Sequence, residues 1–180
     1  DVLICNEKVI QIAPRIEVSA LPGQVKVLQA EGLRLLPGLI DQHVHITGGG
    51  GESGFTSRVP ELRFSQVVEA GVTTLVGMLG TDSHTRSIQN LVAKTKALNE
   101  EGITAYCLTG AYALPSPTLT GSVGDDIAFI QEIIGVKVAI SDHRSMCPSR
   151  EELAKLAAEA RLAGLVSGKV GDCLLYTSDA

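Results

Sequence analysis

Two histidines separated by a single residue follow an apolar stretch near the start of the chain. Residues 37–42 lead directly into His43 and His45. Side chains alternate along a β-strand, so residues spaced in this way lie on the same side of it. Two neutral imidazoles on one side suit a transition metal such as zinc. The alternative is a pair of ordinary polar residues where a strand runs into a loop, and the residues that follow weigh against it.

A lysine stands in the middle of an otherwise apolar segment. Lys137 lies within residues 136–140, which read Val-Lys-Val-Ala-Ile, with no acidic neighbour in sequence. A lysine near a strand end usually extends its ammonium to solvent. A buried lysine instead has a depressed pKa and can act as an amine nucleophile. Such an amine can also take up carbon dioxide and become a carbamate, which is an anionic ligand able to bridge two metals.

Four further side chains follow predicted strands, at the edge where α/β proteins place their sites. Tyr112 lies in a loop rich in glycine, alanine and proline, where a phenol can donate a hydrogen bond to a carbonyl oxygen that gains charge. Arg144 can hold a carboxylate with two parallel bonds. Glu52 can bind an amino group, which Thr81 can help to orient. Core packing and simple solvation remain the alternatives for Tyr112 and Arg144, but together the set suits a small zwitterionic substrate.

The glycine-rich segment after the histidines contains a literal G-x-G-x-x-G pattern at Gly49, Gly51 and Gly54. The pattern is typical of dinucleotide-binding loops when a helix opens at its third glycine. Here Pro60 predicts a later helix start, and histidines occupy the strand end. We therefore interpret the segment as a flexible loop whose bare backbone can approach a ligand.

Composition bounds the class of protein. Of the 180 residues 44% are hydrophobic and 19% charged, which is typical of a globular protein. The net charge of −5 argues against a nucleic-acid or anionic-membrane surface. No apolar run approaches the roughly 20 residues that span a bilayer. The four cysteines form no C-x-x-C pair and predict reduced thiols, so we expect a cytoplasmic protein.

The elements that must position these residues fall into two groups. Residues 1–5, 8–12 and 25–30 predict short strands of a small β domain covering residues 1–36. From residue 37 onward strands and helices alternate, which indicates a parallel sheet. Ser149 and Glu152 form a capping box at the start of the last helix. The predicted strands are 39–45, 72–79, 103–108 and 136–141, and the predicted helices are 60–70, 85–101, 125–134 and 149–163.

This alternation fits either a small open sheet or half of a (β/α)8 barrel, and periodicity alone does not decide between them. The motifs taken together closely resemble the isoaspartyl dipeptidase family, which are metallopeptidases of the amidohydrolase superfamily. The resemblance runs from residue 1 to about 171 and is carried by residues 37–45, 48–52, 79–82, 108–112 and 135–144. It implies an α/β fold in which residues 37–171 are the first half of a TIM-type barrel and residues 1–36 are part of a β-sandwich domain.

The resemblance also implies a metal centre. His43 and His45 match the histidines that ligate one of two zinc ions. Lys137 matches a lysine that is carboxylated by carbon dioxide and bridges both ions. The implied reaction is hydrolysis of a β-aspartyl (isoaspartyl) peptide bond in a dipeptide by a metal-bridging hydroxide. A homo-oligomeric full-length enzyme, with neither nucleic acid nor membrane as partner, is expected.

Substrate contacts follow from the same resemblance. The loop that meets the substrate's amino end, the carbonyl-polarising tyrosine and the arginine that grips the α-carboxylate all have matches here. They are, in chain order, Gly50, Gly51, Glu52, Thr81, Tyr112 and Arg144.

The chain departs from the family in its last residues. The family has two more histidines for the second zinc and an aspartate as general base, and none is found here. Residues 172–180 are expected to be a foreign tail, with Tyr176 near the place of the third histidine. We expect a truncated, inactive fragment, unstable because an open half-barrel exposes strand edges. The alternatives are another amidohydrolase, such as a dihydropyrimidinase or hydantoinase acting on cyclic amides, and a metal-free scaffold.

Overall fold

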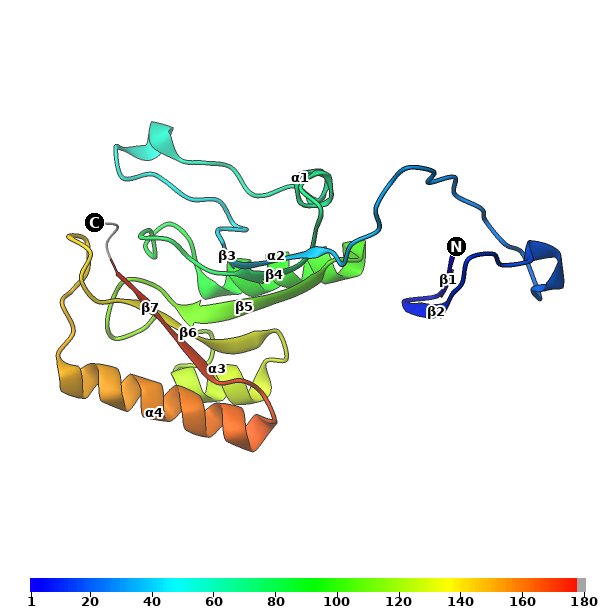
Figure 1. Cartoon of the computed structure of the whole chain (residues 1–180). Helices are drawn as coiled ribbons and strands as arrows, with labels where there is room; N and C mark the ends of the chain where they lie inside the picture. The colour runs from blue at the N-terminus through cyan, green and yellow to red at the C-terminus, as the bar shows by residue number, and fades with distance from the viewer. Residues whose placement is uncertain (178–180) are drawn as a thin grey trace. The chain divides into compact units, whose positions relative to one another are not determined.

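The computed structural model describes residues 1–177, which form two compact units divided after Leu36 (Figure 1). In the first unit β1 (Val2–Cys5) pairs antiparallel with β2 (Lys8–Ile12), and a short 3-10 helix covers Val18–Ala20. The predicted third strand is wrong: residues 25–30 have no regular structure. Its alternating pattern finds no neighbouring strand to pair with, and Leu28 is 76% exposed. Residues 1–36 therefore contain one two-stranded sheet, and their place in a β-sandwich domain stays a prediction.

The second unit is built on one parallel sheet with the strand order β3-β4-β5-β6-β7 (Figure 1). Each strand pairs with the next strand in sequence, so successive β-α units advance in one direction, as they do in a barrel. The sheet is accordingly curled and corresponds to part of a TIM-type barrel, as predicted. The strands are β3 (Leu39–Val44), β4 (Val72–Gly77), β5 (Thr104–Gly110), β6 (Ile133–Ala139) and β7 (Asp172–Tyr176).

Four α-helices connect these strands: α1 (Phe64–Glu69), α2 (Ile88–Glu101), α3 (Val123–Phe129) and α4 (Arg150–Ser167). The predicted capping box of α4 is confirmed, because Ser149 accepts from the Glu152 amide and the Glu152 side chain reaches back to Ser149. Serines also cap α2 and α3, where each accepts a hydrogen bond from the third helical amide.

Three helix boundaries differ from the prediction by four residues or more. α1 begins at Phe64 rather than Pro60, because Leu62 donates its amide to Ile46 O and holds the preceding segment extended. α3 ends at Phe129, since Ile133 pairs with Cys107 and is already part of β6. α4 continues to Ser167 and ends at Gly168, whose left-handed backbone (φ 70°) stops the helix.

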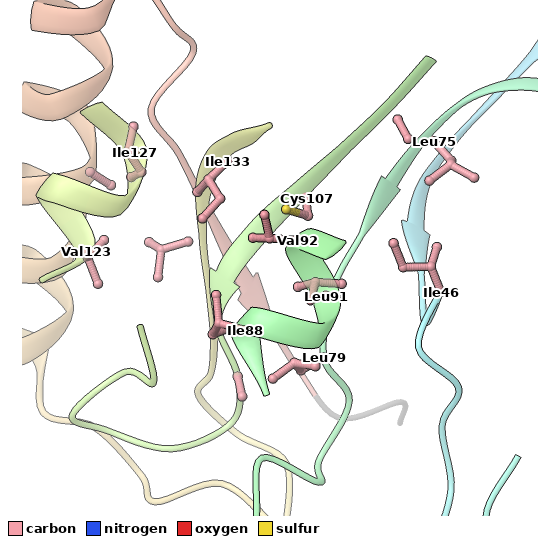
Figure 2. Packing of buried hydrophobic residues seen from close by; sticks show 14 of the residues in the cluster. Ile46, Leu75, Leu79, Ile88, Leu91, Val92, Cys107, Val123, Ile127 and Ile133 are labelled. Carbon is pink, nitrogen blue, oxygen red and sulfur yellow. The ribbon is translucent and has the colours of Figure 1, made fainter. Parts of the chain in front are cut away.

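The hydrophobic core lies between the sheet and its helices (Figure 2). Leu91 of α2 packs there with Leu75 of β4 and Cys107 of β5, all of them fully buried. On β6, Val136 and Val138 belong to this core. Because side chains alternate along a strand, the intervening Lys137 lies on the opposite face of the sheet.

The segment expected to be a foreign tail is partly structured. Asp172–Tyr176 forms β7, in parallel register with β6 from Gly135↔Asp172 to Ala139↔Tyr176. Residues 178–180 lie outside the described residues, and the foreign origin of 172–180 stays a prediction. β3 and β7 are the two edges of the sheet, and Ile40 on β3 is 64% exposed.

All four cysteines are free thiols, and burial raises the pKa of Cys107 to about 12. Across residues 1–177, no helix combines the length and the apolar character that a bilayer crossing requires.

Candidate active site

The sheet brings the predicted site residues together at the carboxyl ends of its strands. His43 lies in β3 and His45 directly follows it. Thr81 follows β4, Tyr112 follows β5, and Lys137 lies in β6. Parallel strands place these ends on one edge of the sheet. The predicted convergence of polar groups is therefore present. The groups form two ends: the histidine–lysine end, with His43, His45 and Lys137, and the charged end, with Glu52, Thr81 and Arg144.

The two histidines form a contacting pair. Their ring centroids are 5.5 Å apart with the rings nearly perpendicular at 87°. Nδ1 of His45 lies 3.0 Å from the Met78 carbonyl oxygen, which requires a hydrogen at Nδ1 and leaves the Nε2 lone pair for another partner. Burial lowers the pKa of both histidines, and the Lys137 charge lowers each further. Both imidazoles are thus neutral near pH 7, which is the form that binds metals.

Lys137 is fully buried at the centre of the site. Its Nζ donates to the Leu79 carbonyl oxygen at 2.8 Å. The same nitrogen lies 5.1 Å from the ring centroid of Tyr112 and 5.4 Å from that of Tyr176. Burial, with a smaller contribution from Arg144, lowers its pKa to about 8. Near pH 7 about a tenth of Lys137 is therefore the free amine, which is the form that reacts with carbon dioxide.

These residues fit a metal when the lysine is counted as a ligand. Within residues 1–177 no cluster of three His, Cys, Asp or Glu side chains could hold a metal ion. Two imidazoles alone leave a zinc ion short of its usual four ligands. A carbamate on Lys137 would add oxygen donors beside them. Tyr176 lies next to this group, with its ring 5.9 Å from that of His43.

The charged end of the site is an ion pair across two loops. Glu52 accepts a hydrogen bond from the Thr81 hydroxyl at 2.6 Å and pairs with Arg144 Nη1 at 2.6 Å. These bonds, that from Thr81 first, lower the pKa of Glu52. Asp142 accepts two bonds from the same guanidinium, at 2.7 Å from Nε and 2.5 Å from Nη2. Arg144 is thus held in one orientation by Asp142 while a third nitrogen faces Glu52.

Tyr112 lies between the two ends. Its ring is 5.1 Å from Lys137 Nζ and 5.5 Å from the Arg144 guanidinium carbon. Burial and a hydrogen bond with Tyr176 raise the pKa of the Tyr112 phenol. The phenol therefore keeps its proton at neutral pH and can act as a hydrogen-bond donor.

A cavity of about 610 Å³ adjoins the charged end. Four of the predicted substrate-binding residues line it: Gly51, Glu52, Thr81 and Arg144. Gly50 does not line it, and instead its backbone bridges to Arg58. His43, His45, Tyr112 and Lys137 are also absent from its lining. The structure thus joins the two ends through Tyr112 rather than through one continuous cavity.

Two buried charged residues that contact the site were missed in the sequence. Asp142 orients Arg144, and Arg86, only 4% exposed, holds the loop that carries Glu52. The acceptors of Arg86 on that loop stand 36 to 39 positions earlier in the chain, so local spacing carries no signal of them. The two-residue separation of Asp142 from Arg144 likewise has no distinctive pattern.

The depressed lysine pKa predicts a pH dependence of stability. The pKa of Lys137 is about 8 in the folded chain and about 10.4 in an unfolded one. Between these values the unfolded state binds more protons, so Lys137 makes the folded state more stable as pH rises. We expect the free energy of unfolding of the wild type to rise relative to Lys137→Met between about pH 8 and 10. Urea titrations of both proteins across this range test it, and a pH-independent difference would contradict it.

The curled parallel sheet carries the histidine pair at the end of its first strand and the buried lysine on its fourth, which is the arrangement that the resemblance to the amidohydrolase superfamily implies. Comparison with known proteins narrows this class. A crystal structure of β-aspartyl dipeptidase from Fervidobacterium islandicum AW-1 is 49% identical, with a TM-score of 0.91 over 96% of this chain and 47% of that one. A second structure of the enzyme, in complex with a β-Asp-Leu dipeptide, gives the same identity and TM-score. The resemblance to the isoaspartyl dipeptidases is confirmed. The solved structures that this chain resembles are therefore peptidases, which are hydrolases.

More distant curated proteins also match. Dihydroorotase from Staphylococcus aureus strain Mu50 is 31% identical over 155 residues, covering 81% of this chain and 34% of that protein. Imidazolonepropionase from Yersinia enterocolitica is 26% identical over 114 residues, 62% of this chain and 28% of that protein. No family model matches the chain. The chain spans about half the length of the solved dipeptidases and about a third of the curated relatives.

Proposed function

We propose that this chain forms the substrate-gripping half of a zinc-dependent hydrolase of β-aspartyl dipeptides. The observation that carries the proposal is the row formed by Glu52, Arg144, Tyr112 and Lys137. It places a carboxylate and a guanidinium 2.6 Å apart at one end, a protonated phenol in the middle, and a buried amine beside two neutral imidazoles at the other. A zwitterionic dipeptide has the charges and the carbonyl that this row complements.

Substrate binding requires the pair between Glu52 and Arg144 to open. The dipeptide's ammonium takes the place of the guanidinium beside Glu52, where Thr81 already donates to the same carboxylate. Its carboxylate takes the place of Glu52 at Arg144, which Asp142 keeps oriented. One ion pair is replaced by two of the same kind, so the net electrostatic cost of opening is small.

Tyr112 then lies at the scissile carbonyl. Its phenol is protonated because burial raises its pKa, so it donates a hydrogen bond to the oxygen that gains negative charge. The position between Arg144 and Lys137 lets one substrate reach the charged end with its carboxylate and the histidine–lysine end with its peptide carbonyl.

His43, His45 and a carboxylated Lys137 would hold the zinc, two ions in the whole enzyme. Zinc, when bound, polarises a carbonyl and makes hydroxide available at neutral pH. The other histidines of the chain, His84 and His143, line the cavity at the charged end and do not lie beside His43 and His45. No further imidazole of this chain therefore stands ready for a second ion. We propose that the chain by itself binds substrate without turning it over, and that the whole enzyme is a cytoplasmic homo-oligomer.

The second candidate is an amidohydrolase that acts on a cyclic amide, which the 31% identity to a dihydroorotase favours. Such an enzyme would share His43, His45 and Lys137. It would have no use for the Glu52–Thr81–Arg144 group, which is why the dipeptide is preferred. A metal-free scaffold is the remaining alternative, and it predicts no stoichiometric zinc.

The experiment is calorimetric titration of the chain, with zinc and bicarbonate, by β-Asp-Leu, α-Asp-Leu and hydantoin. We expect saturable binding of β-Asp-Leu alone, without release of leucine. Arg144→Met is expected to weaken it about tenfold or more, because a charge-assisted bidentate contact of roughly 1.5–3 kcal/mol is lost. The exposed Arg161 of α4 provides the control Arg161→Met. Binding of hydantoin but not β-Asp-Leu would support an enzyme that acts on cyclic amides. Release of leucine would contradict the proposal that the chain by itself binds the dipeptide without turning it over.

A further inference from the structure

Arg86 is a buried cation outside the set of residues that would touch substrate. It precedes Ser87, the N-cap of α2, and its side chain is 3% exposed. A guanidinium removed from water is tolerated only when hydrogen bonds and an opposite charge compensate it. The partners of Arg86 therefore show which part of the molecule depends on it.

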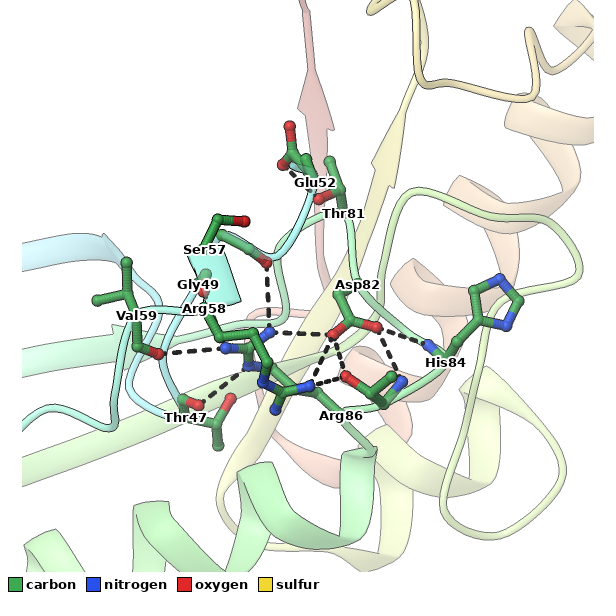
Figure 3. A network of polar contacts seen from close by, with 12 residues as sticks. Thr47, Gly49, Glu52, Ser57, Arg58, Val59, Thr81, Asp82, His84 and Arg86 are labelled. Carbon is green, nitrogen blue, oxygen red and sulfur yellow. Dashed lines mark hydrogen bonds and ion pairs between the residues drawn. The ribbon is translucent and has the colours of Figure 1, made fainter. Parts of the chain in front are cut away.

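These partners lie on the glycine loop, residues 47–52, on the segment that returns from it and on the loop after β4 (Figure 3). Three backbone carbonyls of the glycine loop accept from Arg86: Thr47 O at 3.1 Å, Gly49 O at 2.8 Å and Gly50 O at 3.5 Å. Val59 O, on the returning segment, accepts at 3.2 Å. Asp82, on the loop after β4, is the counterion at 3.0 Å. One guanidinium thus satisfies five acceptors with its five N–H groups.

The glycine loop turns where side chains have no room. At Gly48 (φ 84°) a Cβ would lie 2.1 Å from Val59 O, and at Gly50 (φ 64°) it would lie 2.6 Å from Ser57 O. The two backbones approach too closely for side chains between them. The loop holds its turn through carbonyls directed at Arg86, through the bonds from the Gly48 amide to His45 O at 2.9 Å and from the Val59 amide to Gly49 O at 2.8 Å, and through the bridge between Gly50 and Arg58.

The counterion joins this loop to the second one. Asp82 accepts from the His84 amide at 3.1 Å and from the Thr85 amide at 2.8 Å, which shapes its own loop. Its neighbour in sequence is Thr81, whose hydroxyl donates to Glu52 at 2.6 Å. The Arg86–Asp82 pair therefore links the same two loops that the bond between Thr81 and Glu52 joins.

We infer that Arg86, paired with Asp82, is a positioning residue that sets the glycine loop against the loop after β4 and so places Glu52 for the substrate's ammonium. The inference rests on the proposed function in assigning the ammonium to Glu52. Arg86 does not touch the substrate, and the carboxylate end at Arg144 is held separately by Asp142. Loss of Arg86 should accordingly impair recognition of the amino end and spare recognition of the carboxylate end.

The test uses Arg86→Lys and Asp82→Asn, two conservative changes on opposite sides of the pair, with Arg161→Met as control. Hydrogen exchange of the full chain is measured first. We expect amides of residues 47–52 to exchange about tenfold faster in both variants, a change of about 1.4 kcal/mol in local opening, while β5 and β6 keep their rates. An unchanged glycine loop, or equal acceleration in β5 and β6, would overturn the inference.

Affinity gives the readout that a purely structural role would not move. β-Asp-Leu is compared with its N-acetyl derivative, which lacks the ammonium. We expect Arg86→Lys to weaken the first about tenfold and the second hardly at all, so that the preference for a free amine is lost. Equal weakening of both would overturn the inference. If wild type binds neither compound, the proposed function fails, and hydrogen exchange alone decides whether Arg86 positions the loop.

Discussion

Replacement of Lys137 by methionine is expected to abolish zinc retention by the chain while leaving it at least as stable as wild type. Lys137 is fully buried, and Leu79 O at 2.8 Å is its hydrogen-bonded acceptor. Among the residues that the structure describes, Lys137 has no ion-pair partner, so replacing it with an apolar side chain of similar volume removes the cost of keeping an unpaired charge out of water. The same change removes the amine that would carry the carbamate, and leaves His43 and His45 as an incomplete ligand set.

Metal analysis measures the expected loss of zinc, and thermal melts measure the expected stability. Both proteins are loaded with zinc under bicarbonate, dialysed and analysed for metal, and wild type is also weighed by native mass spectrometry for one added carbon dioxide. Lys155→Met, at an exposed position on α4, is the control and should keep its zinc. Zinc retained by Lys137→Met at the wild-type ratio would remove Lys137 from the ligand set. A lower melting temperature would show that the charge is compensated more fully than the contacts indicate.

Replacement of Asp126 by alanine is expected to cost about 2–4 kcal/mol of folding stability, the largest loss we predict. Asp126 of α3 is fully buried. It accepts from the Thr109 hydroxyl at 2.5 Å, and from the Leu119 amide at 2.9 Å and the Thr120 amide at 2.8 Å. Removing the carboxylate leaves the half-buried Leu119 amide without its acceptor and the buried Thr109 hydroxyl with only the Pro117 carbonyl, at 3.2 Å, while the exposed Thr120 amide can turn to water. Each donor left unpaired in the interior costs roughly 1–3 kcal/mol.

The change should also affect the site, because the loop from β5 to α3 carries Tyr112. Urea titration gives the stability, and Tyr112 is followed through its near-ultraviolet signal against a Tyr112→Phe reference. Asp125→Ala is the matched control: it removes an exposed carboxylate from the same helix turn and should cost less than about 1 kcal/mol. A loss of less than about 1 kcal/mol for Asp126→Ala as well would show that water replaces the carboxylate in this loop.

What the sequence predicted well is what short-range pattern determines. The β-α alternation, the capping box at Ser149 and the histidine pair are all local features, and the parallel sheet then brings the strand ends together. The boundary between α3 and β6 was misplaced because residues 130–134 are apolar enough for either element. Only the pairing of Ile133 with Cys107 decides it, and that pairing is a tertiary contact.

The residues that sequence analysis missed contact partners that lie far from them in the sequence. Arg86 is an unremarkable arginine before a helix, and only the fold shows that its acceptors are loop carbonyls. The strand prediction for residues 25–30 was wrong for a different reason: the pattern suits a strand, but no neighbouring strand pairs with it. Site residues could therefore be predicted where chemistry and strand position coincide. Their supporting contacts could not, because those are set by loops that meet only in the folded chain.

The most direct test of the account is a crystal structure of the chain grown with zinc, bicarbonate and β-Asp-Leu. We predict the dipeptide's ammonium at Glu52 and Thr81, its carboxylate at Arg144, and the Tyr112 hydroxyl at the peptide carbonyl, with metal on His43 and His45 beside a carbamate on Lys137. A dipeptide bound elsewhere, or a site where the Glu52–Arg144 pair stays closed at saturating dipeptide, would contradict the account.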